Sequence, residues 1–168
     1  MKHILEDVKK NKHNNKKQRK GRGSVGKTPV IGLKSREGKV KAYVSSKTDT
    51  HTLTSTIRKN VNAGSSVYTD QFGAYKGLKE FLHKRVNHGN GEYVREQVHT
   101  NGIESFWATL KRGYYGIYHH WSIKHLQRYI NEFTTRFNLR DETPLNRIQS
   151  VITGSYNKHL SYKELINA

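Results

Sequence analysis

The sequence predicts a mixed α/β domain with a helical C-terminal half, and three observations support this. Short apolar or alternating segments typical of strands come first, at residues 30–33, 40–44 and 66–69. Residues 49–64 interrupt them with the apolar spacing of a helix. From residue 101 onward, apolar residues recur every three or four positions. Strands first with an interposed helix, then a helical half, indicate a mixed α/β domain, and 168 residues suit a single domain.

The first predicted elements are a hairpin, a helix and a strand. The segments at 30–33 and 40–44 flank turn residues at 35–38, which indicates the hairpin. Beyond it, a helix carries three apolar residues on one face, namely Leu53, Ile57 and Val61. The strand at 66–69 then ends at Asp70.

The predicted elements of the second half are mostly helices. A short helix carries Tyr75, Leu78 and Leu82, and residues 86–98 are irregular or a weak strand. Longer helices begin near Asn101 and at Ser122. The last two helices are marked by their start signals: an N-cap and first-turn proline at Thr143-Pro144, and capping-box spacing between Ser161 and Glu164.

The composition limits the function classes. Thirty-one Lys and Arg against thirteen Asp and Glu give a net charge of +18, which attracts polyanions and argues against small cationic substrates. The absence of cysteine excludes a disulfide framework, a thiol nucleophile and a cysteine-ligated zinc site. No apolar run is long enough to span a membrane, and the first residues are polar, so we expect a cytoplasmic protein without membrane partners.

The positive charge is concentrated near the beginning of the sequence. Nine Lys or Arg occur between residues 9 and 27, and no acid lies between Asp7 and Glu37. We therefore interpret residues 1–28 as a flexible basic arm that contacts nucleic acid, with a solvated loop as the alternative. The arm residues expected to contact the nucleic acid are Lys16, Lys17, Arg19, Lys20 and Arg22.

Residues 21–28 match the phosphate-loop pattern G-x-x-x-x-G-K-T, but their neighbours do not fit it. A phosphate loop joins a buried strand to the N-terminus of a helix. Here a polybasic run precedes the match, and Pro29 with a strand-like segment follows it. We therefore do not expect nucleotide hydrolysis.

Two acids are candidate site residues. Asp70 ends an apolar strand, at the sheet edge where α/β proteins place ligands, although it could instead be a helix N-cap. Glu104 shares a helix face with Lys111, seven residues later, but with Asn101 it also has capping-box spacing. Carboxylates from different elements can hold the paired magnesium ions of phosphodiester chemistry; two acids are a partial set.

Histidines and aromatic residues offer weaker signals. No H-E-x-x-H arrangement occurs, so a histidine metal site is not favoured. The aromatic run at 114–121, which includes His119 and His120, could stack on bases or close a core, and both alternatives stay open.

The segment from His99 to Gly113, with residues 116–120 and 124–129, closely resembles a subgroup of insertion-sequence transposases. These are the ISXO-like DDE enzymes, which have a ribonuclease H-like core. Residues 69–78 are similar to the segment that holds the second Asp of the family. The resemblance runs from about residue 9 to residue 141, and more loosely to the end.

The resemblance implies DNA cleavage and strand transfer with Mg²⁺ or Mn²⁺. We expect no zinc, because the sequence has no cysteine. It implies that Asp70 and Glu104 are the second and third catalytic acids, that Lys111 is the associated basic residue and that Asn101 lies beside the site. We expect Arg112, His119 and His120 to contact DNA. The implied partners are double-stranded insertion-sequence ends and target DNA in the nucleoid, and a homo-oligomer is left open.

The sequence departs from the family at the first catalytic Asp. Counting back from His13 places Met1 where that Asp is expected, and Glu6-Asp7-Val8 replaces a Gly-Gly-Lys segment. We therefore expect a truncated or inactive transposase, in which residues 29–141 are the catalytic core and 142–168 a helical extension. The alternative is a basic nucleic-acid-binding protein without catalytic activity.

Overall fold

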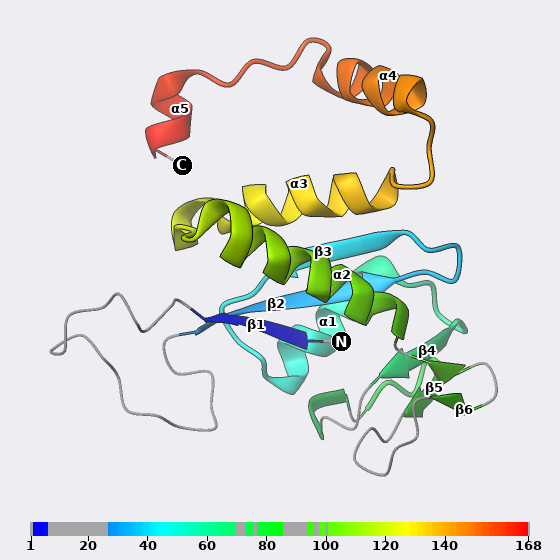
Figure 1. The fold of residues 1–168 in the computed structure, drawn as a ribbon. Coiled ribbons are helices and arrows are strands. Elements are labelled where there is room, and N and C mark those ends of the chain that lie inside the picture. Colours follow the sequence, from blue (N-terminus) through cyan, green and yellow to red (C-terminus); the bar gives the residue numbers. More distant parts are fainter. Residues whose placement is uncertain are drawn as a thin grey trace, which may run out of the picture.

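The computed structural model describes residues 2–6, 27–69, 73–75, 77–85, 94–95, 98–99 and 101–167. It has a mixed α/β architecture, as the sequence predicts (Figure 1). Helices α2 (Asn101–Gly113) and α3 (Leu126–Asn138) cover one face of a three-stranded sheet. Helix α1 (Thr50–Asn60) packs against the other face. Within the described ranges, no helix is both long and apolar enough to cross a membrane.

The three-stranded sheet is antiparallel, in the order β1-β2-β3. The predicted hairpin is confirmed: β2 (Lys27–Lys34) pairs with β3 (Val40–Val44), with Gly32 opposite Ala42. The prediction of an arm over residues 1–28 is wrong at both ends, because Lys2–Glu6 form strand β1 and β2 already begins at Lys27. Both segments gain backbone hydrogen bonds by pairing with each other, which sequence periodicity does not reveal. Residues 7–26 of the predicted arm lie outside the described residues.

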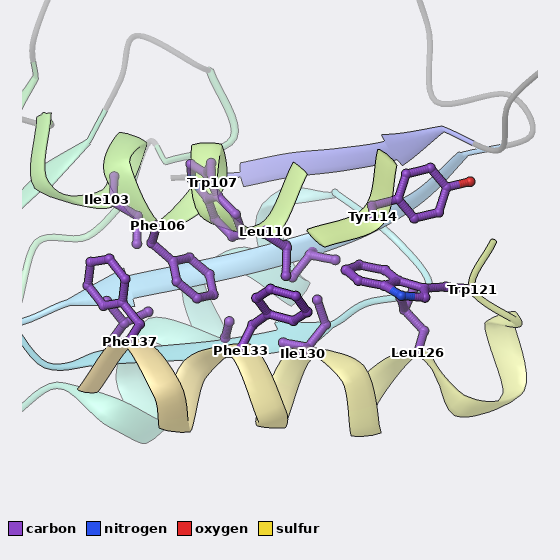
Figure 2. Packing of buried hydrophobic residues seen from close by; sticks show 13 residues of the cluster. Ile103, Phe106, Trp107, Leu110, Tyr114, Trp121, Leu126, Ile130, Phe133 and Phe137 are labelled. Carbon is purple, nitrogen blue, oxygen red and sulfur yellow. The ribbon is translucent and has the colours of Figure 1, made fainter. Parts of the chain in front are cut away.

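Alternation along β2 divides the apolar residues into two cores. Val30 faces α2 and α3, whereas the next residue, Ile31, faces α1. Figure 2 shows the first core, where aromatic residues of α2 and α3 meet between the helices and the sheet. The second core contains the α1 residues Leu53 and Ile57, as their helical spacing predicts.

Two glycines allow the elements of the first core to approach closely. A β-carbon at Gly32 would lie 2.7 Å from Cη2 of Trp107, so the indole ring rests directly on β2. A β-carbon at Gly113 would lie 3.0 Å from Cε2 of Phe133, and closer to two other ring atoms. Glycine at both positions is therefore a packing requirement.

The middle of the chain differs most from its prediction. Strands β4 (Ser66–Thr69) and β5 (Leu82–Arg85) form a parallel pair. The predicted helix through Tyr75 and Leu82 is wrong: among the described residues of this stretch, Gly73–Tyr75 form a short 3₁₀ helix, and Leu82 lies in β5. Short strands β6 (Val94–Arg95) and β7 (Val98–His99) lie within the stretch predicted to be irregular or weakly extended.

The predicted helix starts of the C-terminal half are confirmed. Ser122 caps the 3₁₀ helix Ile123–His125 that leads into α3, and Thr143 caps α4 (Pro144–Ser155). At α5 (Tyr162–Asn167), the Glu164 carboxylate accepts from the Ser161 N–H at 2.8 Å and the Ser161 hydroxyl accepts from the Glu164 N–H at 3.2 Å. These two bonds form the expected capping box.

Candidate functional site

Helix α2 has one buried and one exposed face. The buried face supplies Ile103, Phe106, Trp107 and Leu110 to the first core. Glu104 and Lys111 lie on the exposed face, two turns apart as their spacing predicts, and Arg112 is exposed beside Lys111. The packing that buries the aromatic residues therefore presents one carboxylate and two cations to solvent.

Glu104 lies in the first turn of α2. An acid is favourable there because the N-terminal N–H groups give the start of a helix a partial positive charge. The exposed side chain of Glu104 can interact with the N-terminal N–H groups of α2 and can also face a ligand. Its location is therefore compatible with both predicted roles, a helix cap and a metal ligand.

The second predicted acid, Asp70, directly follows strand β4. Ser66 at the start of that strand is exposed and Thr69 at its end is buried, so Asp70 follows directly on a buried position. Asp70 itself lies outside the described residues, as do the side chain of Asn101 and the five arm residues expected to bind DNA. The distance between Asp70 and Glu104 therefore stays untested.

A threonine–histidine pair lies at the end of β4. Thr69 Oγ1 lies 2.8 Å from Nε2 of His83 on the neighbouring strand β5. Partial burial lowers the pKa of His83 below its usual value, and the charge of Arg85 lowers it further. The sequence alone could not identify this pair, because it depends on the parallel register of β4 and β5.

Lys34 is a further basic residue that the sequence does not single out. The end of β2 brings its side chain over Gly102, where an added β-carbon would lie 3.0 Å from both Cδ and Cε. Lys34 thereby reaches the first turn of α2, two residues from Glu104. A strand and a helix 68 positions apart create this contact, so local sequence spacing gives no signal for it.

The aromatic run after α2 was predicted either to pack in the core or to contact nucleic-acid bases, and its residues differ in this respect. Trp121 belongs to the core, where its ring stacks on Tyr129 with centroids 5.3 Å apart (Figure 2 shows Trp121 between the helices). His119 and His120 are exposed, beyond the π-helical turn Tyr114–Tyr118. Core packing therefore accounts for Trp121, while the two histidines are accessible to a ligand.

A family model described as an ISXO2-like transposase domain matches residues 5–138. The chain belongs to this transposase family. The match contains β2, β3 and the whole of α2 and α3, and it confirms the resemblance seen in the sequence. Both candidate acids, Asp70 and Glu104, lie inside the matched residues.

A relative from Halobacterium salinarum supports the assignment to the transposase family. It is described as an uncharacterized protein in transposable element ISH50 and is 33% identical over 123 residues. The alignment covers 70% of this chain but only 42% of that relative, so the chain spans less than half of the relative's length. No solved structure matches the chain.

Proposed function

We propose that this transposase-family chain is a DDE-type catalytic domain that cleaves and joins double-stranded DNA at insertion-sequence ends. The observation that carries the proposal is the exposed face of α2, which holds Glu104 and Lys111 inside the family-matched region. A carboxylate and an ammonium group on one face suit a metal-bound phosphate beside a second phosphate.

The order of the elements supports a ribonuclease H-like core as part of the proposal. Three antiparallel strands come first, α1 follows, and β4 and β5 then run parallel to each other. An antiparallel group followed by a helix and a parallel pair is the order of elements that such a core requires, although the two groups form separate sheets in the described residues. Strand β4 leads directly to Asp70, and α2 carries Glu104.

The proposed cofactor is Mg²⁺ or Mn²⁺, which would be held by Asp70 and Glu104. The exposed carboxylate of Glu104 fits the preference of both ions for oxygen ligands. In the described part of the chain, no three His, Asp or Glu side chains gather as a metal site. When bound, a pair of divalent ions activates the attacking hydroxyl or water and stabilises the leaving oxygen. Lys111, with Asn101 beside the site, would position the phosphate.

DNA binding in this proposal depends on phosphate contacts. The net charge of +18 supplies the long-range attraction. Arg112 is held near Thr109, whose hydroxyl accepts from its guanidinium at 3.1 Å, and His119 and His120 are exposed further along. With the arm residues 16–22, these groups would follow the DNA backbone.

The expected loss of the first catalytic Asp stays a prediction.

The test compares the whole chain with single variants on end DNA in Mn²⁺. Any nicking or joining by the wild type should be lost in Asp70→Ala and Glu104→Gln, while both variants still bind DNA. Glu37→Gln is the matched control, since Glu37 is an exposed acid on the β2–β3 turn. Mn²⁺ binding, followed by electron paramagnetic resonance, should weaken in the two site variants and not in the control.

Three results would reject parts of the proposal. Nicking that survives Asp70→Ala and Glu104→Gln would reject the site residues. Equal Mn²⁺ binding in all four proteins would reject the metal ligands. A wild type that binds both Mn²⁺ and end DNA but never nicks would support an inactive transposase, whereas DNA binding without Mn²⁺ binding would favour the alternative of a non-catalytic DNA-binding protein.

A further inference from the structure

The strand pair β4 and β5 has an inner and an outer face. On the inner face, Val67 packs against the second core and Thr69 is buried. Because side chains alternate along a strand, Ser66 and Tyr68 lie on the opposite, outer face. The parallel register places the exposed residue Lys84 beside Tyr68 on that face. The outer face therefore brings a tyrosine and a lysine together.

The turn between β2 and β3 adds a guanidinium to this outer face. Arg36 Cζ lies 5.1 Å from the centroid of the Tyr68 ring. Hydrogen bonding from Arg36 is the main cause that lowers the pKa of the Tyr68 phenol, and a hydrogen bond from Ser66 and the charge of Lys84 lower it further, against the opposing effect of burial. Surroundings that favour the anionic form of a phenol also favour an incoming anion. We call Arg36, Tyr68 and Lys84 the tyrosine cluster.

The tyrosine cluster belongs to the end of the molecule that holds the proposed catalytic site. Tyr68 is two residues before Asp70 in the sequence, and the turn that carries Arg36 begins directly after Lys34, which reaches the first turn of α2. Figure 1 shows the β2–β3 turn, the start of α2 and strands β4 and β5 at the same end of the molecule. The end of β2 and its turn thus supply one cation to each of the two elements that lead to a candidate acid.

The arrangement of these cations suits a ligand with several phosphates. The side chains of Lys34 and Arg36 leave the same strand end in different directions, toward α2 and toward β4. Cations that bind one small anion converge on it, whereas diverging cations can contact separate phosphates of a nucleic-acid backbone. Residues 34–37, 66–69 and 82–85 hold four Lys or Arg and one acid, a net charge of +3 on 12 residues, against +18 on 168 for the whole chain. The positive charge per residue is therefore more than twice the average here.

Tyr68 gives the Arg36 side chain a defined position. A guanidinium has five N–H donors, more than one phenol oxygen can accept, and its planar fork fits two oxygens of a phosphate. A long side chain loses rotamer freedom when it binds a ligand, and a side chain that is already held loses less. The Tyr68 hydroxyl can also donate its own proton to a phosphate oxygen.

We propose that Arg36 and Lys84 bind phosphates of the double-stranded DNA beside the catalytic site, with Tyr68 as the positioning residue for Arg36. The choice of DNA as the ligand rests on the proposed function. Binding to the tyrosine cluster requires no cleavage, so it is measured without divalent ions.

Fluorescence anisotropy with labelled end DNA compares two double variants of the full chain. Arg36→Ala/Lys84→Ala should bind roughly tenfold more weakly than the wild type, because charge-assisted hydrogen bonds are lost. Its slope of log K against log salt should be smaller by about 1.8, since two phosphate contacts are removed. Lys59→Ala/Lys158→Ala is the matched control, which removes two exposed cations, one in α1 and one between α4 and α5, and should bind more tightly than the first variant. Equal losses of affinity and slope in the two variants would overturn the proposal.

Tyr68→Phe tests the positioning role, because it removes the hydroxyl group and no charge. Its DNA affinity should fall while its salt slope stays that of the wild type. Arg36→Lys, which keeps the charge and loses the planar fork, should behave in the same way, and combining the two changes should cost less affinity than the sum of the single effects. Tyr162→Phe in the exposed helix α5 is the matched control. If Tyr68→Phe and Tyr162→Phe bound DNA equally well, Tyr68 would have no positioning role.

The absence of cysteine allows a direct test of location. Ser66→Cys, beside Tyr68, can carry an iron chelate whose hydroxyl radicals cut nearby DNA, and Ser155→Cys at the end of α4 is the control, since both serines are exposed. Cutting from position 66 alone would support the proposal, whereas cutting from position 155 alone, from both equally or from neither would overturn it. A wild type that binds no DNA would overturn this inference together with the proposed function. Unequal binding of the two double variants would support the inference even if no protein nicks DNA.

Discussion

The side-chain amide of Asn138 pairs with the backbone of Val40 as a neighbouring strand would. Asn138 Oδ1 accepts from the Val40 N–H at 2.7 Å, and Nδ2 donates to the Val40 carbonyl at 2.8 Å. Gln127 does the same further along β3, where it accepts from the Val44 N–H at 2.7 Å and donates to the Ala42 carbonyl at 3.1 Å. Helix α3 thus satisfies the polar groups of an edge strand.

Asn138→Ala should lower the free energy of unfolding by about 1–3 kcal/mol, because a buried N–H and carbonyl at Val40 lose their partners. Urea denaturation measures the loss. Asn146→Ala is the control: this exposed residue bonds only Glu142 through its side chain in the described contacts, at 3.3 Å, and should change stability by less than about 0.5 kcal/mol. Equal stability of the two variants would show that the amide pairing is not required.

Gly113→Ala should destabilise the first core by about 1–3 kcal/mol, because the new methyl group collides with the buried ring of Phe133. Gly154→Ala is the matched change in α4, where nothing lies within 4 Å of the added carbon. There the better helix propensity of alanine should leave stability unchanged or raise it by up to about 1 kcal/mol. A tolerated Gly113→Ala would mean that the ring can move aside.

Protonation of His83 should destabilise the fold in a defined pH range. The pKa of His83 is lowered from 6.5 in the folded chain, first by burial and then by Arg85. The unfolded chain therefore binds the proton more readily, so the free energy of unfolding falls as pH drops below about 6.5 and levels off below the folded-state pKa. The Asp49 carboxylate, whose pKa is lowered from 3.8 by the Thr52 N–H, loses its contribution only near and below that value.

His83→Gln keeps a polar partner for Thr69 and removes the titration. Denaturation between pH 5 and pH 7 should therefore give a flatter stability profile than for the wild type. If the free energy of unfolding changed with pH in the same way in both proteins, the titration of His83 would not contribute to the pH dependence of stability.

Lys34→Ala should weaken DNA binding if Lys34 serves the proposed site, since its side chain reaches the first turn of α2. Removing one phosphate contact should reduce the slope of log K against log salt by about 0.9. Gly102→Ala should have a similar effect, because the added methyl group displaces the flexible lysine without destabilising the helix. The double variant should bind no more weakly than Lys34→Ala alone.

Lys158→Ala, between α4 and α5, is the control for nonspecific loss of charge. Its DNA affinity should change least of the set. A Lys158→Ala variant that loses as much affinity as Lys34→Ala would mean that total charge, and not the location of Lys34, determines binding.

Local signals in the sequence predicted much of the helical half. The caps at Thr143 and Ser161 depend on a side chain and a backbone N–H three residues later, so the sequence pattern contains the whole interaction. The same holds for the shared exposed face of Glu104 and Lys111, which follows from helical periodicity.

Tertiary context determined what the sequence could not predict. Leu82 fits a helical stripe but lies exposed in β5, because parallel pairing with β4 overrides the spacing. The strand at residues 2–6 depends on pairing with β2, more than twenty positions away. The Thr143-Pro144 start signal predicts α4 correctly, yet it could not reveal that no described part of the chain covers the apolar side of this helix.

The π-helical turn after α2 makes the number of residues in this region a structural constraint. The His119 N–H donates to the carbonyl of Tyr114, five residues earlier, at 2.7 Å, and His119 itself has a left-handed φ of 57°. A π-turn holds one residue more than an α-helical turn. Deleting one residue between Tyr114 and Trp121, both fixed in the core, would rotate the intervening side chains by about 100°. Natural variants of this region should therefore keep its length.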